Sequence, residues 1–198
     1  KDIKTKKTLK KYNFPIYAIS NNGEYGLSLN FSRLAWCRPG YGYTNIPDIT
    51  IEEYEPEKDG IYLCSLDSND MNLLLSIKQI SNIQRLESMD NAIHYFNHLS
   101  FSPSGKRFLF LHLWVKDKNR FSRLITSNIN GDKINILNND GYTSHNCWKK
   151  DNSILSYSEE PILGKNYFIY NDDNGNVELF ANGQIKHDSH PSFPEDKN

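Results

Sequence analysis

The segment His98–Leu111 reads His-Leu-Ser-Phe-Ser-Pro-Ser-Gly-Lys-Arg-Phe-Leu-Phe-Leu and combines two short apolar runs with a polar turn that ends at Gly105. Glycine or asparagine is favoured at the end of such a turn, where the backbone often needs a positive φ. The same order of apolar run, polar turn and apolar run recurs along the chain. The further copies are 16–29, 145–158 and an incomplete copy at 190–197. This recurrence predicts a repeated antiparallel hairpin.

The spacing of the repeats indicates the architecture. The turn positions Gly23, Gly105, Asn152 and Lys197 are separated by 82, 47 and 45 residues. A second hairpin follows each of the first three copies, and in two of them its turn is Asn-Gly, the strongest short hairpin signal. Steps of about 40–50 residues with four strands each are typical of propeller blades. The sequence therefore predicts an all-β fold, a β-propeller of four-stranded antiparallel blades.

About three blades and the start of a fourth are expected within a single domain, 1–198. Their predicted ranges are 14–76, 97–138, 145–181 and, for the start of the next blade, 189–198. The innermost strands should begin near residues 17, 98 and 146, and helix should account for less than a quarter of the chain. The long first step is explained by two insertions: a loop at 38–59, either packed or substrate-lining, and a short helical segment at 77–89.

Three blades cannot close a ring, and a propeller hides its strand edges only by closing. We therefore expect the remainder of a propeller of about six to eight blades in a longer chain, or a second copy of this chain, to complete it. The segment alone should expose a wide apolar flank and associate in solution.

The composition excludes several classes of protein. Lysine and arginine number 23 and aspartate and glutamate 24, so the formal net charge is −1, which argues against a nucleic-acid-binding domain. No apolar run approaches the roughly 20 residues of a membrane span. Cys37, Cys64 and Cys147 are odd in number and far apart, as expected for free thiols in a reducing compartment, so a cytoplasmic location is predicted.

The repeat alignment places three histidines at the same position. His98, His145 and His190 each lie three residues before an aromatic residue of the repeat, Phe101, Trp148 and Phe193 respectively. This position should be the entrance of the innermost strand, which faces the central channel of a propeller. The three imidazoles are therefore expected to lie around the axis, with ring distances within about 15 Å if they share a metal. A structural role inside each blade is the alternative.

A second register contains Asn30, His112 and Glu159, each seven residues after a turn position. The end of the second strand and the start of the first lie on the same face of an antiparallel blade, so these side chains should join the histidines. Imidazoles with oxygen ligands suit a divalent transition metal, which could bind a substrate carboxylate. His94 and His187 fall outside both registers and are expected to be ordinary loop histidines.

Other candidates are less specific. Arg33 and Arg123 both occur in the sequence Phe-Ser-Arg-Leu. Arg33 could reach the channel mouth and pair with a carboxylate, whereas Arg123 is expected to face solvent. The aromatic residues that could stack on sugar rings, or simply pack, are Trp114, Tyr41 and Tyr43. No phosphate-binding loop, Cys-x-x-Cys pair or serine nucleophile elbow occurs in the sequence.

The repeat at 98–108 resembles that of the periplasmic Tol-type propellers. The wider set of motifs resembles the oligogalacturonate lyase group, whose relatives include proteins that accompany polysaccharide biosynthesis. The motifs are His98 with Phe110-Leu-His112-Leu-Trp114, Ser144-His145-Asn-Cys-Trp148 and Asp188-Ser-His190-Pro-Ser-Phe193. The resemblance covers about residues 14–193.

This resemblance implies a seven-bladed propeller with manganese held by histidines and a glutamine, and β-elimination on uronate oligomers. His145 and His190 would be the metal ligands, and His98 the base, with His112 its competitor. The glutamine has no counterpart in this sequence.

Two functions are therefore expected. The first is a metal-assisted lyase in which a neutral imidazole removes the C5 proton beside a uronate carboxylate, with an acidic oligosaccharide as substrate. The second is a non-catalytic propeller that binds a glycan or a protein in polysaccharide assembly, because one fold hosts many activities.

Overall fold

The computed structural model describes residues 2–193, which form three consecutive four-stranded sheets with antiparallel pairing throughout. Strands account for 42% and helices for 10%, which confirms the all-β prediction. The first sheet contains β1 (Ala18–Ile19), β2 (Tyr25–Leu29), β3 (Gly60–Ser65) and β4 (Asp70–Ser76). The second contains β5 (Ile93–Phe101), β6 (Arg107–Lys116), β7 (Asn119–Asn128) and β8 (Asn135–Asn138). The third contains β9 (Thr143–Lys150), β10 (Ser153–Glu160), β11 (Gly164–Asn171) and β12 (Val177–Leu179).

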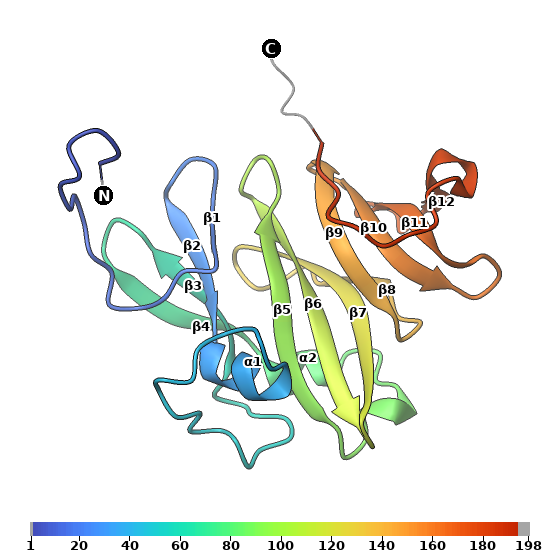
Figure 1. Cartoon of the computed structure of the whole chain (residues 1–198), viewed down its shortest axis with the longest axis horizontal. Coiled ribbons are helices and arrows are strands. Elements are labelled where there is room, and N and C mark those ends of the chain that lie inside the picture. Colours follow the sequence, from blue (N-terminus) through green and yellow to red (C-terminus); the bar gives the residue numbers. More distant parts are fainter. Residues whose placement is uncertain (1, 194–198) are drawn as a thin grey trace.

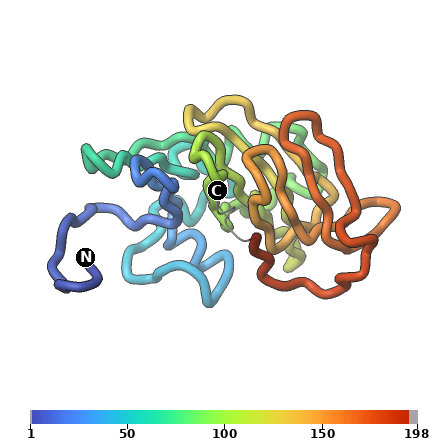
Figure 2. Tube along the Cα trace, turned by 90° about the horizontal axis from the view of Figure 1, so that it is seen from above, coloured from blue at the N-terminus to red at the C-terminus, as the bar shows by residue number. Residues whose placement is uncertain are grey.

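The sheets lie side by side in chain order, and the view from above shows them as successive layers (Figures 1 and 2). Each sheet follows the order of its strands, so strands that are consecutive in the chain are neighbours in the sheet. The first strands, β1, β5 and β9, lie at corresponding edges, and β5 contacts both β1 and β9. The strand that begins each repeat therefore holds neighbouring sheets together.

The predicted strand starts are close in the first and third sheets but not in the second. The structure begins β1 at Ala18 and β9 at Thr143, whereas β5 begins at Ile93, five residues before the predicted 98. The stretch Ile93–Asn97 extends the pairing because it lies opposite the far end of the long β6. His98 is thus an internal residue of β5 and not the entrance to it, which corrects the prediction.

One continuous hydrophobic core fills the spaces between the sheets. Leu27, Ile61 and Leu75 of the first sheet are fully buried and cluster with Phe96 and Phe110 of the second. Trp148, Ile154 and Phe168 of the third sheet belong to the same cluster. Each such side chain contributes about 1.5–3 kcal/mol on burial, so the sheets are stabilised chiefly by their mutual contacts.

The loop expected at 38–59 is preceded by a helix that was not predicted, α1 (Phe31–Cys37). The side chain of Asn30 caps it by accepting hydrogen bonds from the backbone N–H groups of Ser32 and Arg33. The helical insertion predicted at 77–89 is confirmed in part, as α2 (Ile77–Ser81) followed by the 3₁₀ helix η1 (Glu87–Met89). Ile77 and Ile80 face the core, as expected.

The outer face of the third sheet is covered by the segment 184–193, here called the C-terminal strap, which follows the 3₁₀ helix η2 (Phe180–Gly183). Figures 1 and 2 show it returning from the far edge of the sheet toward the middle of the molecule. Tyr157 Oη donates to Lys186 O at 3.1 Å, and Tyr167 Oη donates to Ser189 O at 2.8 Å and accepts from Ser189 N at 2.9 Å.

The strap changes two expectations. Its described part contains no strand, and the rest of the predicted fourth repeat lies outside the described residues. The strap buries Tyr157 and Tyr167, but exposed apolar side chains remain on the first sheet (Ile19, Met71 and Leu73) and around the third (Ile162, Leu163 and Val177). Among the residues that the structure describes, no helix is long and apolar enough to cross a membrane.

Candidate functional site

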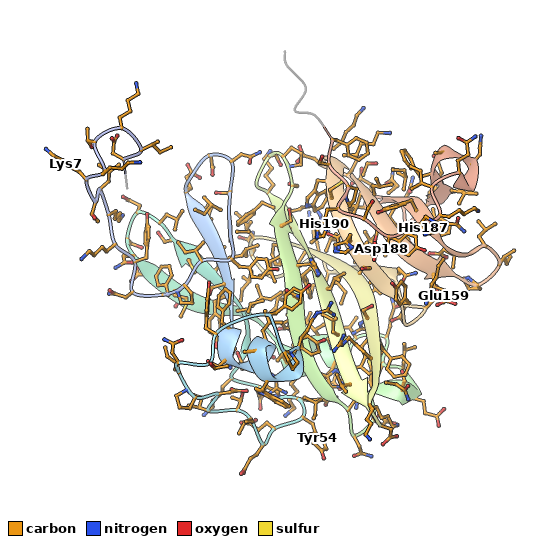
Figure 3. All side chains as sticks on the ribbon, viewed as in Figure 1. Lys7, Tyr54, Glu159, His187, Asp188 and His190 are labelled. Carbon is orange, nitrogen blue, oxygen red and sulfur yellow. The ribbon has the colours of Figure 1, made fainter. Side chains whose placement is uncertain are left out.

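His98, His145 and His190 lie together, as the repeat alignment predicts. The ring centres of His98 and His145 are 5.8 Å apart, and those of His145 and His190 are 4.0 Å apart. The three side chains come from β5, β9 and the strap, so two sheets and a covering segment contribute one histidine each. We call this group the histidine face, and Figure 3 labels its outermost member, His190.

Two β-bulges aim His98 and His145 at this face. In β5, Asn97 pairs with Leu111 but Ser100 pairs with Leu109, which leaves one extra residue on the β5 side. An equivalent shift occurs in β9 between Thr143 and Asn146, around His145. His98 itself adopts φ 53°, a conformation that non-glycine residues rarely take. Bulges and strained backbone of this kind cluster beside functional sites, where they redirect a side chain.

The bulge at His98 is held by side-chain hydrogen bonds from neighbouring sheets. Tyr17 Oη lies 2.9 Å from Asn97 Oδ1 and accepts a hydrogen bond from His98 N at 3.2 Å. Trp148 Nε1 donates to Ser100 O at 3.1 Å. The conformation of His98 is therefore determined by the first and third sheets as well as by its own strand.

Asp188 is a further member that the sequence did not identify. Its Oδ1 lies 2.9 Å from His145 Nδ1, and both side chains are about one quarter exposed. This contact fixes the orientation of the imidazole and directs Nε2 away from the carboxylate. A carboxylate behind a histidine is the usual support of a metal-ligating or proton-transferring imidazole. The position of Asp188 two residues before His190 is the signal that could have found it.

The charge state of His98 is set by its surroundings. The pKa of His98 is lowered to about 4, chiefly by burial and in addition by charge repulsion from His145 and Arg38. The ring is therefore neutral at neutral pH. Arg38 follows α1, and its guanidinium lies 4.6 Å from the ring centre of Tyr41.

Two side chains of the histidine face could ligate a metal ion, but among the residues that the structure describes a third protein ligand is not grouped with them. His145 and His190 have ring centres close to the ~5 Å expected for two imidazoles on one ion, and Asp188 supports one of them. Within residues 2–193, no three His, Cys, Asp or Glu side chains are arranged to hold a metal ion. The pair therefore fits a site whose other ligands are water or substrate.

His112 does not join the histidine face, which corrects the second-register prediction. It is fully buried, its Nε2 lies 2.8 Å from His94 Nδ1, and Arg123 Nε lies 3.0 Å from its Nδ1. His94, expected in a loop, is a fully buried residue of β5. His187 is an exposed residue of the strap. His112 therefore has no access to a ligand and cannot compete with His98 as the base, contrary to the prediction.

Arg33 and Arg123 are both buried, so neither prediction about them is correct. Arg33 is 1% exposed and donates to the carbonyl groups of four residues, His94, Thr50, Glu53 and Tyr54. Arg123 is likewise buried and donates to carbonyl groups that end α2. Both side chains hold inserted segments against the sheets, and Arg33 Nη1 lies 3.7 Å from Asp48 Oδ2, so neither is free to bind a substrate carboxylate.

The remaining predicted substrate residues are dispersed. Asn30 is occupied as the cap of α1 and as a donor to Asp48 and Asp59, both at 2.8 Å. Trp114 is fully buried and stacks on Phe121. Glu159 is the second-last residue of β10 and lies near Lys165, and Figure 3 labels it apart from His190.

Tyr41 and Tyr43 are exposed, by 41% and 60%, on the loop after α1. They are therefore the two predicted sugar-stacking residues that a ligand could reach.

Comparison with models of known protein families and with curated proteins gave no match.

Proposed function

We propose that this protein binds an acidic, uronate-containing oligosaccharide at the histidine face and cleaves it by metal-assisted β-elimination. We further propose that its three sheets are consecutive blades of a β-propeller. The observation that supports the function is the convergence of His98, His145 and His190 from corresponding positions of successive repeats. This convergence, with a carboxylate behind one ring and a neutral imidazole beside it, matches the division of roles expected for such a reaction.

His145 and His190 would hold the ion, and Asp188 would keep His145 in its ligating orientation. A bound divalent ion such as manganese would bind the uronate carboxylate and stabilise the negative charge that develops beside it. Arg38 lies near enough to His98 to act on its charge and adds positive charge to the site.

His98 would accept the C5 proton, because its ring is neutral at neutral pH. The electrons of the C5–H bond then form the C4–C5 double bond. The glycosidic oxygen leaves C4 with its bonding electrons and takes a proton from water. A base whose pKa is about 4 is weak, so activation of the C5–H bond by the cations must lower much of the barrier.

The same low pKa favours a second candidate, a non-catalytic glycan-binding propeller. A neutral, partly buried imidazole donates and accepts hydrogen bonds well but removes protons poorly. In that case the histidine face would bind the acidic sugar without cleaving it.

The test uses the intact protein with oligogalacturonate and other uronate oligomers, with and without Mn²⁺, and follows the ultraviolet absorbance of unsaturated uronate. Wild type should form product, His145→Ala should lose bound metal and activity, and His98→Gln should keep the metal but lose activity. The matched control is His187→Ala, an exposed histidine outside the face. Binding without product would favour the non-catalytic candidate, and no binding of any uronate would overturn both.

A further inference from the structure

We infer that a second carbohydrate subsite, specific for a neutral sugar ring, lies in the open cavity between α1 and the first sheet. The cavity measures about 440 Å³ and is lined by the end of β2, the start of α1, the loop around Tyr43 and residues of β3 and β4. This volume is in the usual range for small-molecule sites. The assignment of its ligand to the same oligosaccharide rests on the proposed function.

Tyr43 is a prearranged platform for a ring. Its backbone N–H donates to Phe31 O at 3.2 Å, and its side chain packs on Phe31 with ring centres 5.2 Å apart. With 60% of Tyr43 exposed, one face of the ring is covered and the other is open. Gly42 makes this approach possible, because it has φ 69° and a Cβ there would lie 2.2 Å from Phe31 O.

The chemistry of the cavity favours an uncharged ligand. None of its described lining residues carries a charged side chain. Two carboxylates, Asp48 and Asp59, lie behind the lining, where Asn30 Nδ2 donates to each at 2.8 Å and Tyr62 Oη lies 3.3 Å from Asp59. A negatively charged sugar would therefore meet no cation among the residues that line the cavity, and the Arg33 guanidinium behind it is already paired with Asp48.

The lining combines apolar and hydrogen-bonding groups in the way that a pyranose requires. Leu29, Phe31 and Met71 provide apolar surface, while Asn45, Tyr43 and Tyr62 place an amide and two phenol groups around it. The carbon-bound hydrogens of a sugar pack on aromatic rings, and its hydroxyl groups bond to such polar atoms. A purely aliphatic ligand would make no hydrogen bonds with these polar groups.

A row of aromatic rings connects this cavity with the histidine face. Phe31 stacks on Tyr17 at 6.0 Å between ring centres, and the hydroxyl of Tyr17 contacts the bulge at Asn97 and His98. The row Tyr17, Phe31 and Tyr43 thus begins at the backbone N–H of His98 and ends in the cavity. A chain with an acidic sugar at the histidines would place a neutral sugar near Tyr43.

The test measures binding of the neutral disaccharides cellobiose and maltose to the intact protein by calorimetry and by NMR chemical-shift changes. At least one should bind and shift the signals of Tyr43 and Asn45, and Tyr43→Ala should weaken that binding at least tenfold. Tyr41→Ala is the matched control, an exposed tyrosine two residues away that does not line the cavity.

His145→Ala separates the two proposals, because it removes the histidine face and should leave disaccharide binding unchanged. Binding that persists there supports the cavity subsite even if no lyase activity is found. The inference is overturned if neither disaccharide binds wild type, or if the Tyr41 and Tyr43 variants lose binding equally. Circular dichroism establishes that both variants are folded.

Discussion

His94 Nδ1 lies 2.8 Å from His112 Nε2, and both rings are completely buried. The neighbours determine the proton positions. Arg123 Nε donates to His112 Nδ1, so the His112 proton is on Nε2 and points to His94 Nδ1. His94 can then donate from Nε2 to Met89 O, 3.1 Å away, or to Glu55. This one-directional chain has two neutral imidazoles and no place for an additional proton.

We predict that unfolding stability falls as the pH is lowered from about 6.5 to 4. Burial lowers the pKa of His94 to about 4, although Glu55 and Met89 oppose this, and Arg85 and Arg123 reinforce it. Burial also places the pKa of His112 well below its usual value. The unfolded chain binds these protons first, so His94 alone should cost about 3 kcal/mol across this range. Urea unfolding at several pH values measures the slope.

The control for this slope is the exposed His187. His187→Gln should keep the wild-type pH dependence of the unfolding free energy. His112→Gln should make that free energy depend less on pH and should lower it at pH 7. Equal slopes in wild type and His112→Gln would contradict the assignment.

Replacing either buried arginine should be strongly destabilising. Arg33→Met leaves the carbonyl groups of His94, Thr50 and Glu53 without donors, and removing one partner of a buried charged network costs about 3–5 kcal/mol. Arg120→Met, at an exposed position of β7, should change stability by less than about 0.5 kcal/mol. Urea midpoints of the two variants and wild type give the comparison. A loss below about 1 kcal/mol for Arg33→Met would show that water replaces the side chain.

The three thiols should react slowly in the folded protein. Burial raises the pKa of Cys37 to about 12 and those of Cys64 and Cys147 to about 11, so little thiolate exists at pH 8. Iodoacetamide labelling followed by mass spectrometry should be much slower in buffer than in urea. Rapid labelling of a cysteine in the native protein would mean that its surroundings open readily.

Asp188→Asn should weaken binding of Mn²⁺ or Zn²⁺ by about 10–100-fold, the usual effect of losing the partner of a ligating histidine. The unfolding free energy should change by less than about 1 kcal/mol, because the side chain is partly exposed. Asp67→Asn, at an exposed turn of the first sheet, should affect neither quantity. Calorimetric titration of each protein measures the difference, and equal affinities would remove Asp188 from the site.

The strands and the histidine face were predictable because their signals are local or repeated. Asn-Gly turns lie in the chain itself, and one offset before Phe101, Trp148 and Phe193 places the three histidines. The bulge at His98 was not predictable, because the hydroxyl of Tyr17 that supports it is 81 residues away in sequence. For the same reason, the burial of Arg33 was missed, since its partners include a carbonyl group 61 residues distant.

Helix α1 was missed for a different reason. Its seven residues are too few for a clear helical period, and most of its stability comes from packing of Leu34 and Ala35. Its one sequence signal is Asn30, a residue type that favours helix N-caps, but the repeat register assigns Asn30 to ligand binding instead.

The C-terminal strap divides the histidine face between parts of unequal stability. His98 and His145 belong to paired strands, whereas Asp188 and His190 belong to a segment held largely by tyrosine hydroxyl groups. Amide hydrogen exchange should therefore reveal opening of the strap at a lower free energy than opening of β5 or β9. Such opening withdraws Asp188 and His190 together and leaves every sheet intact. A population of molecules that is fully folded by circular dichroism can consequently contain a fraction without a complete histidine face, and a ligand of that face would shift it toward the closed form.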